Sequence, residues 1–326
     1  MVGSHLADLI LKKKDWQIVG VCRWRSPIDN IKHLIGVSEK KNARIIFDYA
    51  DLNDYSSLLT IMKKHKPDYI FHLAAQSFPK ASFDMPIVTF DTNISGTYRL
   101  LDTVVKSKIN PIIHVCSSSE VFGRVKKEKL PINEDCSFHP ASPYAISKVG
   151  TDLIGRYFFE ANKLKILTTR MFTHTGPRRS DFFAESSFAK QIAMIEANKN
   201  SDTVYVGNLN SLRTIADVRD AVSAYLMLVT EKPKFGEVYN IGGKKSMTIK
   251  EILNYLISIS KQKNKIKIKL DKKRLRPIDA DLQVPDVSKF KNHTGWEPKI
   301  NYKKTLKDLL DYWREKVKKE GVFFNR

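Results

Sequence analysis

The sequence predicts an α/β protein built around a doubly wound parallel sheet. Short, continuous apolar runs bounded by polar turns recur along the first half of the 326-residue chain. Segments with the periodicity of an amphipathic helix separate these runs. Continuous apolar strands that alternate with helices are typical of a parallel sheet covered on both faces. Ligands bind outside the carboxyl ends of such strands, so we expect the functional site there.

The chain opens with a predicted helix. Val2–Ile10 has the pattern of the first turns of an amphipathic helix, and no strand precedes it. A dinucleotide-binding fold places a strand and a glycine-rich turn ahead of this helix, so that the backbone can approach the pyrophosphate. Only the last glycine of that turn, Gly3, is present. We therefore expect two exposed strand edges, weak dinucleotide binding and a lower stability than that of a form with upstream residues.

Strands and helices then alternate. The predicted strands are Gln17–Cys22, Ala43–Phe47, Tyr69–Leu73, Ile112–Cys116 and Ile166–Arg170. The predicted helices are Tyr55–Lys64, Thr97–Lys106 and Tyr144–Asn162. Each strand is an apolar run between polar turns, and each helix has apolar positions three and four residues apart.

The pattern loosens after about residue 172, where glycine, proline and arginine gather at Gly176–Arg179. Thr214–Leu228 is periodic enough to rejoin the sheet region, and the end of the chain resembles a smaller α/β lobe. We predict a dinucleotide-binding domain of residues 1–172, joined by about 211–243, and a substrate lobe of residues 173–210 and 244–326. The cleft between them is the expected ligand site.

The composition indicates a globular protein without a metal. Hydrophobic residues make up 42% of the chain, and no apolar run approaches the roughly 20 residues that cross a bilayer. No secretory signal pattern is visible, so we predict a cytoplasmic protein with no membrane partner. The three cysteines are widely spaced and the eight histidines form no ligand cluster, so neither disulfides nor a metal site is expected.

A formal net charge of +21 would suit a polyanionic partner. The excess is mostly lysine, scattered along helices and concentrated in runs such as Lys261–Lys273. RNA-binding modules instead interleave aromatic residues with arginine. We therefore predict a solvated lysine-rich surface and no nucleic-acid partner, with part of the charge available to an anionic small molecule.

Two short motifs carry the candidate chemistry. In Pro143–Lys148, Tyr144 and Lys148 stand four residues apart and share one helix face. The ammonium can lower the pKa of the phenol, which then acts as a base near neutral pH. Ser117–Glu120 lies at the end of the preceding strand and offers a hydroxyl that could hold the substrate oxygen. Together the motifs indicate carbinol-to-carbonyl chemistry, although such helix pairs and capping serines also occur without function.

Further motifs follow one another in order along nearly the whole chain. They are Leu73–Ser77, Ser82–Pro86, Asn93 with Gly96–Thr97, Ser118–Gly123, Pro143–Lys148, Gly176–Arg179, Gly207–Asn208 with Ser211–Arg213, Arg276–Pro277 and Gly295–Trp296. This set resembles the extended short-chain dehydrogenase/reductases, and within them the GDP-mannose 4,6-dehydratase branch. The resemblance implies an NAD(P)-binding Rossmann fold with a smaller C-terminal lobe for a sugar nucleotide.

The resemblance also implies catalytic roles. Tyr144 is expected to transfer the proton, Lys148 to bind the nicotinamide ribose and lower the pKa of Tyr144, and Ser118 to orient the reacting oxygen. Glu120 separates the possible reactions. Oxidation of a hexose at C4 makes the C5 proton acidic, and a carboxylate can remove it while the C6 hydroxyl departs as water. A solvated strand-end carboxylate is the alternative for Glu120, and related sugar-nucleotide decarboxylases can also carry a Glu here.

Cofactor choice depends on the turn after the second strand of such a fold, where an acidic residue binds a ribose 2′-hydroxyl and a basic one a 2′-phosphate. Arg23 and Arg25 stand there without a carboxylate. They favour NADP over NAD, although two surface arginines would give the same pattern. The resemblance places Asn93 in support of the active-site helix. The other cofactor contacts that it implies are Gly3, Asp51, Leu52, Ala74, Ala75, Gln76, Tyr144 and Lys148.

For the substrate, the resemblance places Arg213 and Arg276 where the family neutralises the diphosphate of a sugar nucleotide. Further expected contacts are Ser77, Ser119, Thr173 and Lys190. Thr173 stands where an asparagine is usual, and Thr214–Ile215 replaces a usual polar-aromatic pair. A GDP-heptose or another GDP-hexose is therefore also open.

These expectations combine into one hypothesis with named alternatives. We predict a GDP-mannose 4,6-dehydratase-like lyase that converts a GDP-hexose to its 4-keto-6-deoxy form by internal NADP redox and water elimination. One alternative is a GDP-4-keto-6-deoxy-sugar reductase or epimerase of the same family. The others are a non-catalytic member without the cofactor loop, and nucleic-acid binding through the lysine-rich surface. The resemblance further implies a homodimer or homotetramer.

Overall fold

The computed structural model of the chain describes residues 1–40, 42–231 and 233–319. The helices are α1 Val2–Lys13, α2 Lys32–Ser38, α3 Tyr55–His65, α4 Pro79–Asp84, α5 Pro86–Phe90, α6 Gly96–Lys106, α7 Pro143–Asn162, α8 Ala184–Glu196, α9 Val218–Thr230, α10 Ile249–Ser258, α11 Ser288–Thr294 and α12 Tyr302–Lys319. Short helical turns are η1 Asp91–Ser95, η2 Ser119–Phe122, η3 Lys127–Lys129 and η4 Lys272–Arg274. The strands are β1 Ile18–Cys22, β2 Ile45–Tyr49, β3 Tyr69–His72, β4 Ile112–Cys116, β5 Lys165–Met171, β6 His174–Thr175, β7 Thr203–Val206, β8 Leu212–Thr214, β9 Ala216–Asp217, β10 Val238–Ile241, β11 Ser246–Thr248, β12 Lys267–Leu270 and β13 Leu282–Gln283.

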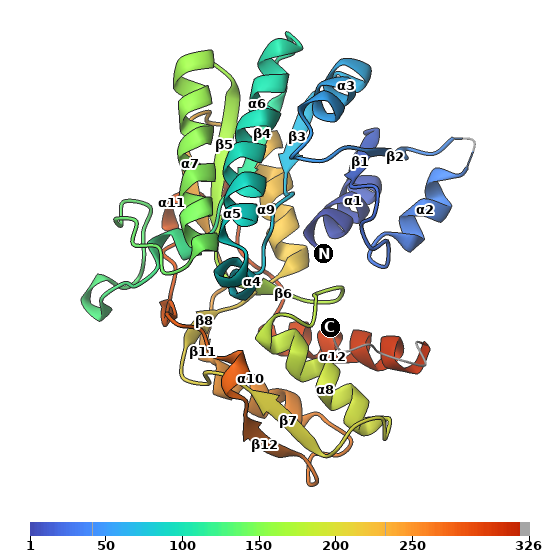
Figure 1. The fold of residues 1–326 in the computed structure, drawn as a ribbon, viewed down its shortest axis with the longest axis vertical. Coiled ribbons are helices and arrows are strands. Elements are labelled where there is room, and N and C mark those ends of the chain that lie inside the picture. Colours follow the sequence, from blue (N-terminus) through green and yellow to red (C-terminus); the bar gives the residue numbers. More distant parts are fainter. Residues whose placement is uncertain (41, 232, 320–326) are drawn as a thin grey trace.

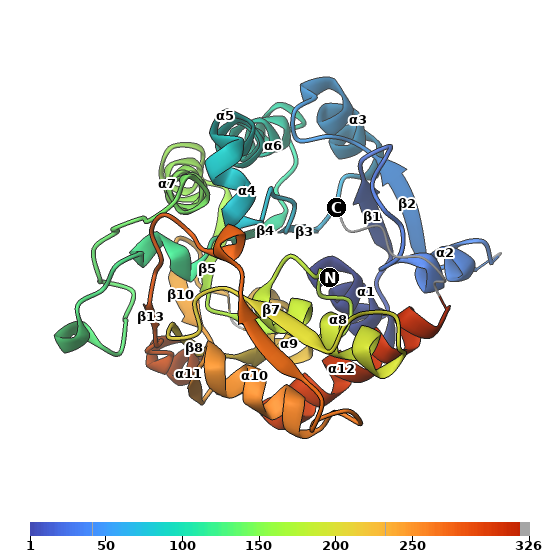
Figure 2. The same cartoon turned by 60° about the horizontal axis from the view of Figure 1, so that its bottom comes forward.

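A four-stranded parallel sheet in the order β10-β5-β4-β3 forms the centre of the molecule. Helices α3, α6 and α7 cover one face, and α9 and α11 cover the other (Figures 1 and 2). Along β4, Ile113 and Val115 pack on the first face, while Ile112 and Cys116 pack on the second. The doubly wound fold predicted from the sequence is therefore confirmed. We call this sheet and its covering helices the central unit.

The first 50 residues form a smaller parallel sheet, which we call the N-terminal unit. Here β1 pairs with β2, with Ile18 opposite Ile45. Within the described residues β1 and β3 share no ladder, so each keeps one unpaired edge, as expected from the sequence. Helix α1 joins the two units, because Leu6 and Ile10 pack against Val222 and its neighbours on α9.

The lower lobe of Figure 1 is built around α8, α10 and α12, which share one apolar core with β7. Strand β12 pairs with β7, and β8 lies between β11 and β13 in a three-stranded sheet. Over the described residues no helix has the length and apolar character needed to cross a bilayer. Those residues also contain no cluster of His, Cys, Asp or Glu that could hold a metal ion.

Candidate active site

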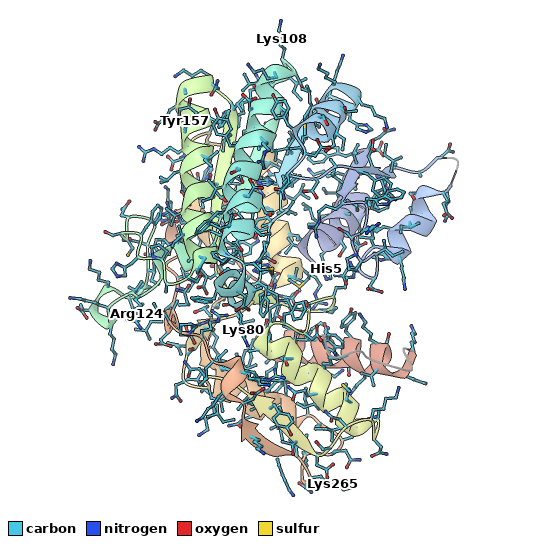
Figure 3. All side chains as sticks on the ribbon, in the orientation of Figure 1. His5, Lys80, Lys108, Arg124, Tyr157 and Lys265 are labelled. Carbon is cyan, nitrogen blue, oxygen red and sulfur yellow. The ribbon has the colours of Figure 1, made fainter. Side chains whose placement is uncertain are left out.

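A cleft of about 1460 Å³ opens between the central unit and the lower lobe. The carboxyl ends of β4 and β5, the start of α7 and one side of α8 contribute to its lining. In Figure 3, Lys80 on α4 and His5 on α1 lie toward the lower lobe. More basic than acidic side chains line the cleft, which suits an anionic ligand. The cleft lies at the strand ends where parallel sheets bind ligands.

All the residues that the sequence offered for catalysis and substrate binding line this one cleft. They are Ser77, Ser118, Ser119, Glu120, Tyr144, Lys148, Thr173, Lys190, Arg213 and Arg276. They come from elements far apart in the chain, so only the fold brings them together.

Helix α7 presents Tyr144 and Lys148 to the cleft. Ser142 caps the helix, with its hydroxyl accepting a hydrogen bond from the Ala145 amide at 3.0 Å, and Pro143 takes the first helical position. The amide of Tyr144 donates to Ser82 Oγ at 3.0 Å. These contacts fix the start of the helix, and both functional side chains are buried.

The surroundings of Tyr144 set its proton affinity. Burial raises the pKa of Tyr144, because the phenolate loses its solvation, while a hydrogen bond with Ser118 and the positive charge of Arg179 lower it. The Lys148 ammonium donates to the carbonyl oxygen of Cys116, and burial lowers the pKa of Lys148. Arg179 thus supplies a positive charge that opposes the rise of the Tyr144 pKa, and the role that the sequence suggested for Lys148 stays a prediction.

Glu120 lies on the short turn η2, which follows β4. Ser118 caps this turn by accepting a hydrogen bond from the Glu120 amide at 3.2 Å. The charge of Glu120 raises the pKa of Tyr144, as expected for a carboxylate that lines the same cleft as a buried phenol. A phenol, a hydroxyl that lowers its pKa and a carboxylate thus line one cleft.

Asn93 holds the catalytic helix against the loop that follows β3. Its side chain accepts from the Gln76 amide at 2.8 Å and donates to the Gln76 carbonyl and to Ser147 Oγ, each at 2.9 Å. Asn93 is only 1% exposed, so these bonds satisfy an otherwise costly buried amide. The Gln76 side chain bonds within its own loop, to the backbone of Phe78 and to Thr89.

Arg213 and Arg276 converge on one carboxylate. Arg213 Nη2 lies 3.4 Å and Arg276 Nη1 lies 3.6 Å from Asp279 Oδ1. Asn208 and Ser211 also donate to Asp279 Oδ2, each at 3.2 Å. The two arginines are therefore held side by side, in an arrangement that matches the two charges of a diphosphate.

The residues expected to bind the cofactor are more dispersed. Gly3 and Ala75 line the cleft, whereas Arg23, Arg25, Asp51, Leu52, Ala74 and Gln76 do not. Arg23 and Arg25 are exposed on the turn after β1. Leu52 is buried against Gly96 and helps to pack α3 on α6. Arg23, Asp51 and Ala74 follow the carboxyl ends of β1, β2 and β3, and Gln76 is joined to α7 through Asn93.

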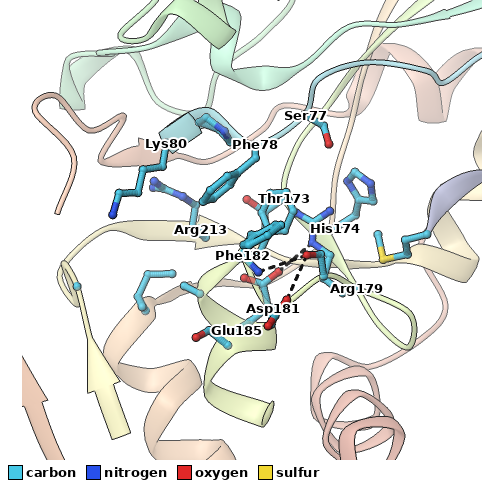
Figure 4. A pocket seen from close by; sticks show the side chains of 18 of the residues that line it. Ser77, Phe78, Lys80, Thr173, His174, Arg179, Asp181, Phe182, Glu185 and Arg213 are labelled. Carbon is cyan, nitrogen blue, oxygen red and sulfur yellow. Dashed lines mark hydrogen bonds and ion pairs between the residues drawn. The ribbon is translucent and has the colours of Figure 1, made fainter. Parts of the chain in front are cut away.

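Several cleft residues were missed at the level of sequence. Figure 4 shows Phe78 stacked on Phe182, with ring centroids 5.0 Å apart, near Arg179 and Glu185. The guanidinium of Arg179 lies 3.3 Å from the ring centroid of Phe183 and 3.6 Å from Glu185 Oε1. The Gly176–Arg179 motif was a signal for Arg179, but nothing in the sequence pointed to the aromatic side chains.

Comparisons with known proteins bear on the chemistry of this cleft. Residues 1–309 match the family model described as GDP-mannose 4,6 dehydratase. GDP-mannose 4,6 dehydratase 1 from Arabidopsis thaliana is 31% identical over 328 residues, which cover 98% of this chain and 89% of the relative. GDP-6-deoxy-D-mannose reductase from Pseudomonas aeruginosa is 30% identical over 254 residues, covering 78% and 83%. The solved structure of RMD from Pseudomonas aeruginosa, complexed with NADPH, is 27% identical with a TM-score of 0.78, covering 92% of this chain and 100% of that one.

Proposed function

This chain belongs to the GDP-mannose 4,6 dehydratase family, and we propose that it removes water from a GDP-hexose to give the 4-keto-6-deoxy sugar nucleotide. The observation that carries the proposal is the shared cleft of Tyr144, Ser118 and Glu120. Chemistry at C4 alone needs only a base and a hydroxyl. Elimination across C5 and C6 also needs a group that moves the C5 proton, and Glu120 is placed to do so.

NADP is the cofactor that we propose for this reaction. His174 Nε2, which lines the cleft, is buried and has no hydrogen-bond partner among the described residues. Buried polar atoms are normally hydrogen-bonded, so this nitrogen supports a polar ligand. Gly3, at the start of α1, has open space beside its Cα, as backbone binding of a pyrophosphate requires. When bound, the nicotinamide supplies the chemistry of accepting a hydride from C4 and returning it to C6.

The residues of the chain divide the proton transfers between them. Ser118 holds O4 of the hexose, and Tyr144 takes its proton as C4 becomes a carbonyl. Glu120 then removes the C5 proton, which the new carbonyl has made acidic. The C6 hydroxyl leaves as water with that proton, which returns Glu120 to its carboxylate form. Glu120 then takes up a proton from solvent and delivers it to C5, and Tyr144 releases the O4 proton to solvent, so that the protons balance. Arg213 and Arg276 hold the diphosphate, with Ser77, Ser119, Thr173 and Lys190 along the rest of the nucleotide sugar.

The direct experiment is incubation of the protein with GDP-mannose and NADP, followed by mass spectrometry of the nucleotide sugar. We expect the loss of one water in the wild type and in Glu128→Gln, an exposed glutamate outside the cleft. Glu120→Gln should lose this activity. If the wild type releases no water but turns over a GDP-4-keto-6-deoxyhexose, the reductase, which the 30% identical Pseudomonas aeruginosa relative represents, is the better assignment. No turnover of either substrate, even in a form with a complete glycine-rich turn, would favour a non-catalytic member.

We also propose that the chain works as a homodimer or homotetramer. Large apolar side chains are exposed on the neighbouring helices α5, α6 and α7, and such patches commonly mark interfaces. They are Ile87, Val88, Tyr98, Ile146, Leu153 and Tyr157. Leu153→Glu should reduce the molar mass measured by light scattering, whereas Leu270→Glu, an equally exposed position on β12, should not. An unchanged mass for Leu153→Glu would contradict assembly through these helices.

The division into domains remains a proposal as well. We propose that residues 1–172 and about 211–243 bind NADP and that residues 173–210 and 244–326 bind the sugar nucleotide. A cytoplasmic location and the absence of a nucleic-acid partner stay predictions from the sequence.

A further inference from the structure

The segment after β6 is tied to the N-terminal unit by its backbone and its side chains. Arg178 Nη1 donates to Asp8 Oδ2 at 2.7 Å and to Ser4 Oγ at 3.2 Å. Asn30 Nδ2 donates to the Arg178 carbonyl at 3.2 Å, and His5 Nε2 lies 3.0 Å from the carbonyl oxygen of Pro177. These partners lie more than 140 residues apart in sequence. We call this set of contacts the latch.

The conformation of the segment depends on the latch. Arg178 has a φ of +70°, in the left-handed region of backbone conformation that residues other than glycine seldom adopt. Such a conformation persists only where the surroundings determine it strongly. On the other side, an added Cβ at Gly176 would lie 2.9 Å from Val218 Cγ1, so the backbone is pressed against α9. The segment is therefore fixed between α1 and α9.

The next residue along the chain reaches the catalytic group. Arg179 lines the cleft, stacks on Phe183 and lowers the pKa of Tyr144 by its charge. Both arginines line the cleft, and they leave the same backbone turn toward different partners: Arg178 bonds to Asp8 and Ser4 on α1, whereas Arg179 stacks on Phe183. A change in the anchoring of Arg178 would move Arg179 relative to Tyr144.

We propose that Arg178 is a positioning residue, which uses its bonds to Asp8 and Ser4 to hold Arg179 beside Tyr144. The N-terminal unit then sets part of the catalytic geometry, although its sheet is separate from the central one. This inference rests on the proposed function, because it assigns a consequence to the protonation of Tyr144. It does not extend to the diphosphate, since Arg213 and Arg276 lie on other segments and pair with Asp279.

The test measures GDP-mannose dehydration by Arg178→Gln, Asp8→Asn and the double variant. Misplacement of a catalytic group by about 1 Å can cost about a hundredfold, so we expect each single change to lower kcat by at least about tenfold. KM for GDP-mannose should stay within about twofold, because the diphosphate arginines are untouched. The double variant should be no slower than the slower single one, since both changes break the same bond. Arg178→Lys, which keeps the charge, should recover part of kcat.

Glu237→Gln is the matched control, because Glu237 forms an ion pair of the same 2.7 Å length with Lys289 and does not line the cleft. Its kcat should equal that of the wild type. Amide hydrogen exchange over residues 177–183 should rise in Arg178→Gln and Asp8→Asn, but not in the control, while the thermal midpoint changes little.

Three results would overturn this proposal. The first is wild-type kcat in both single variants, and the second is an additive loss in the double variant. The third is a rise of KM by the same factor as the loss of kcat in a single variant, because it would show general damage to the site. A wild-type chain that releases no water from GDP-mannose would defeat the proposed function itself, and the role of Arg178 in catalysis with it.

Discussion

The N-terminal unit and the central unit are built from the same kind of parallel strand but are buried to very different degrees. Ile113 and Val115 of β4 are fully buried, whereas Val21 of β1 is 50% exposed and Ile46 of β2 is 44% exposed. The central unit places Tyr144 and Ser147 of α7 in a network of buried hydrogen bonds, while the N-terminal unit is joined through α1 and the latch. The central sheet, with its two covered faces, therefore supplies most of the geometry of the proposed site.

The largest expected effect is on the reaction rate, and it comes from a Tyr→Phe change in the central unit compared with the same change in the N-terminal unit. Tyr144→Phe removes the phenol to which we assign transfer of the O4 proton, and loss of a general base lowers the rate by about 10²–10⁴-fold. Tyr49→Phe makes the same change in the N-terminal unit, at a residue that is 53% exposed and contacts Trp24. Its rate should stay within about twofold of the wild type. Equal rates for wild type and Tyr144→Phe in steady-state assays would remove Tyr144 from the mechanism.

A second comparison concerns two asparagines. Asn93→Ala removes three hydrogen bonds of a buried side chain, to the Gln76 amide, the Gln76 carbonyl and Ser147 Oγ, so the free energy of unfolding should fall by about 2–3 kcal/mol. Asn30→Ala removes a single bond, to the Arg178 carbonyl at a half-buried place, and should cost about 0.5–1.5 kcal/mol. Urea unfolding monitored by circular dichroism measures both. A larger fall in the free energy of unfolding for Asn30→Ala than for Asn93→Ala would contradict the view that the buried contacts of the central unit contribute more to stability.

The smallest expected effect is the response of the central unit to acid. Burial lowers the pKa of His72 and of His114 to about 3, from an ordinary value of 6.5. A lowered pKa in the folded state means that the stability contributed by each neutral imidazole is fully present above pH 6.5 and is lost as the pH falls toward 3. Each buried histidine should cost about 1 kcal/mol between pH 7 and pH 5.5.

His114→Phe should reduce that loss, because His114 packs between Phe71 and Tyr225 and its partner Thr169 also bonds to Tyr225. The measurement is the urea midpoint at pH 7 and pH 5.5 for both proteins. A drop in midpoint of the same size in the variant would show that buried histidines of the central unit do not govern its acid sensitivity.

The sequence predicted the bounds of strands and helices more accurately in the central unit than in the N-terminal unit. It placed β4 at its observed bounds and α7 within one residue, because strong apolar patterns and a proline cap marked them. It placed β2 two residues too early, since Asp48 and Tyr49 interrupt the apolar run, although Tyr49 continues the ladder opposite Cys22. Thr214–Leu228 split into the end of β8, β9 and most of α9. Local patterns are thus reliable where both faces are buried and weaker at an exposed sheet.

In the candidate site, too, local sequence patterns identified single motifs but not the contacts between distant residues. The motif Pro143–Lys148 identified the helix that carries Tyr144, but not the bond from Lys148 to the Cys116 carbonyl. The shared partner of Arg213 and Arg276, Asp279, lies 66 residues from the first of them, and the latch joins residues even farther apart. Such contacts depend on how the lobes fold against each other, which no local pattern records.

The most direct test of the central claim is to run the reaction in D₂O and to locate deuterium in the product by NMR. We expect the wild-type chain with NADP to release one water from GDP-mannose and to leave one deuterium on C5, because the Glu120 carboxyl exchanges its proton with solvent. Glu120→Gln should give neither change. A dehydrated product with unlabelled C5, or unchanged dehydration by Glu120→Gln, would contradict the proton transfer that we assign to this cleft.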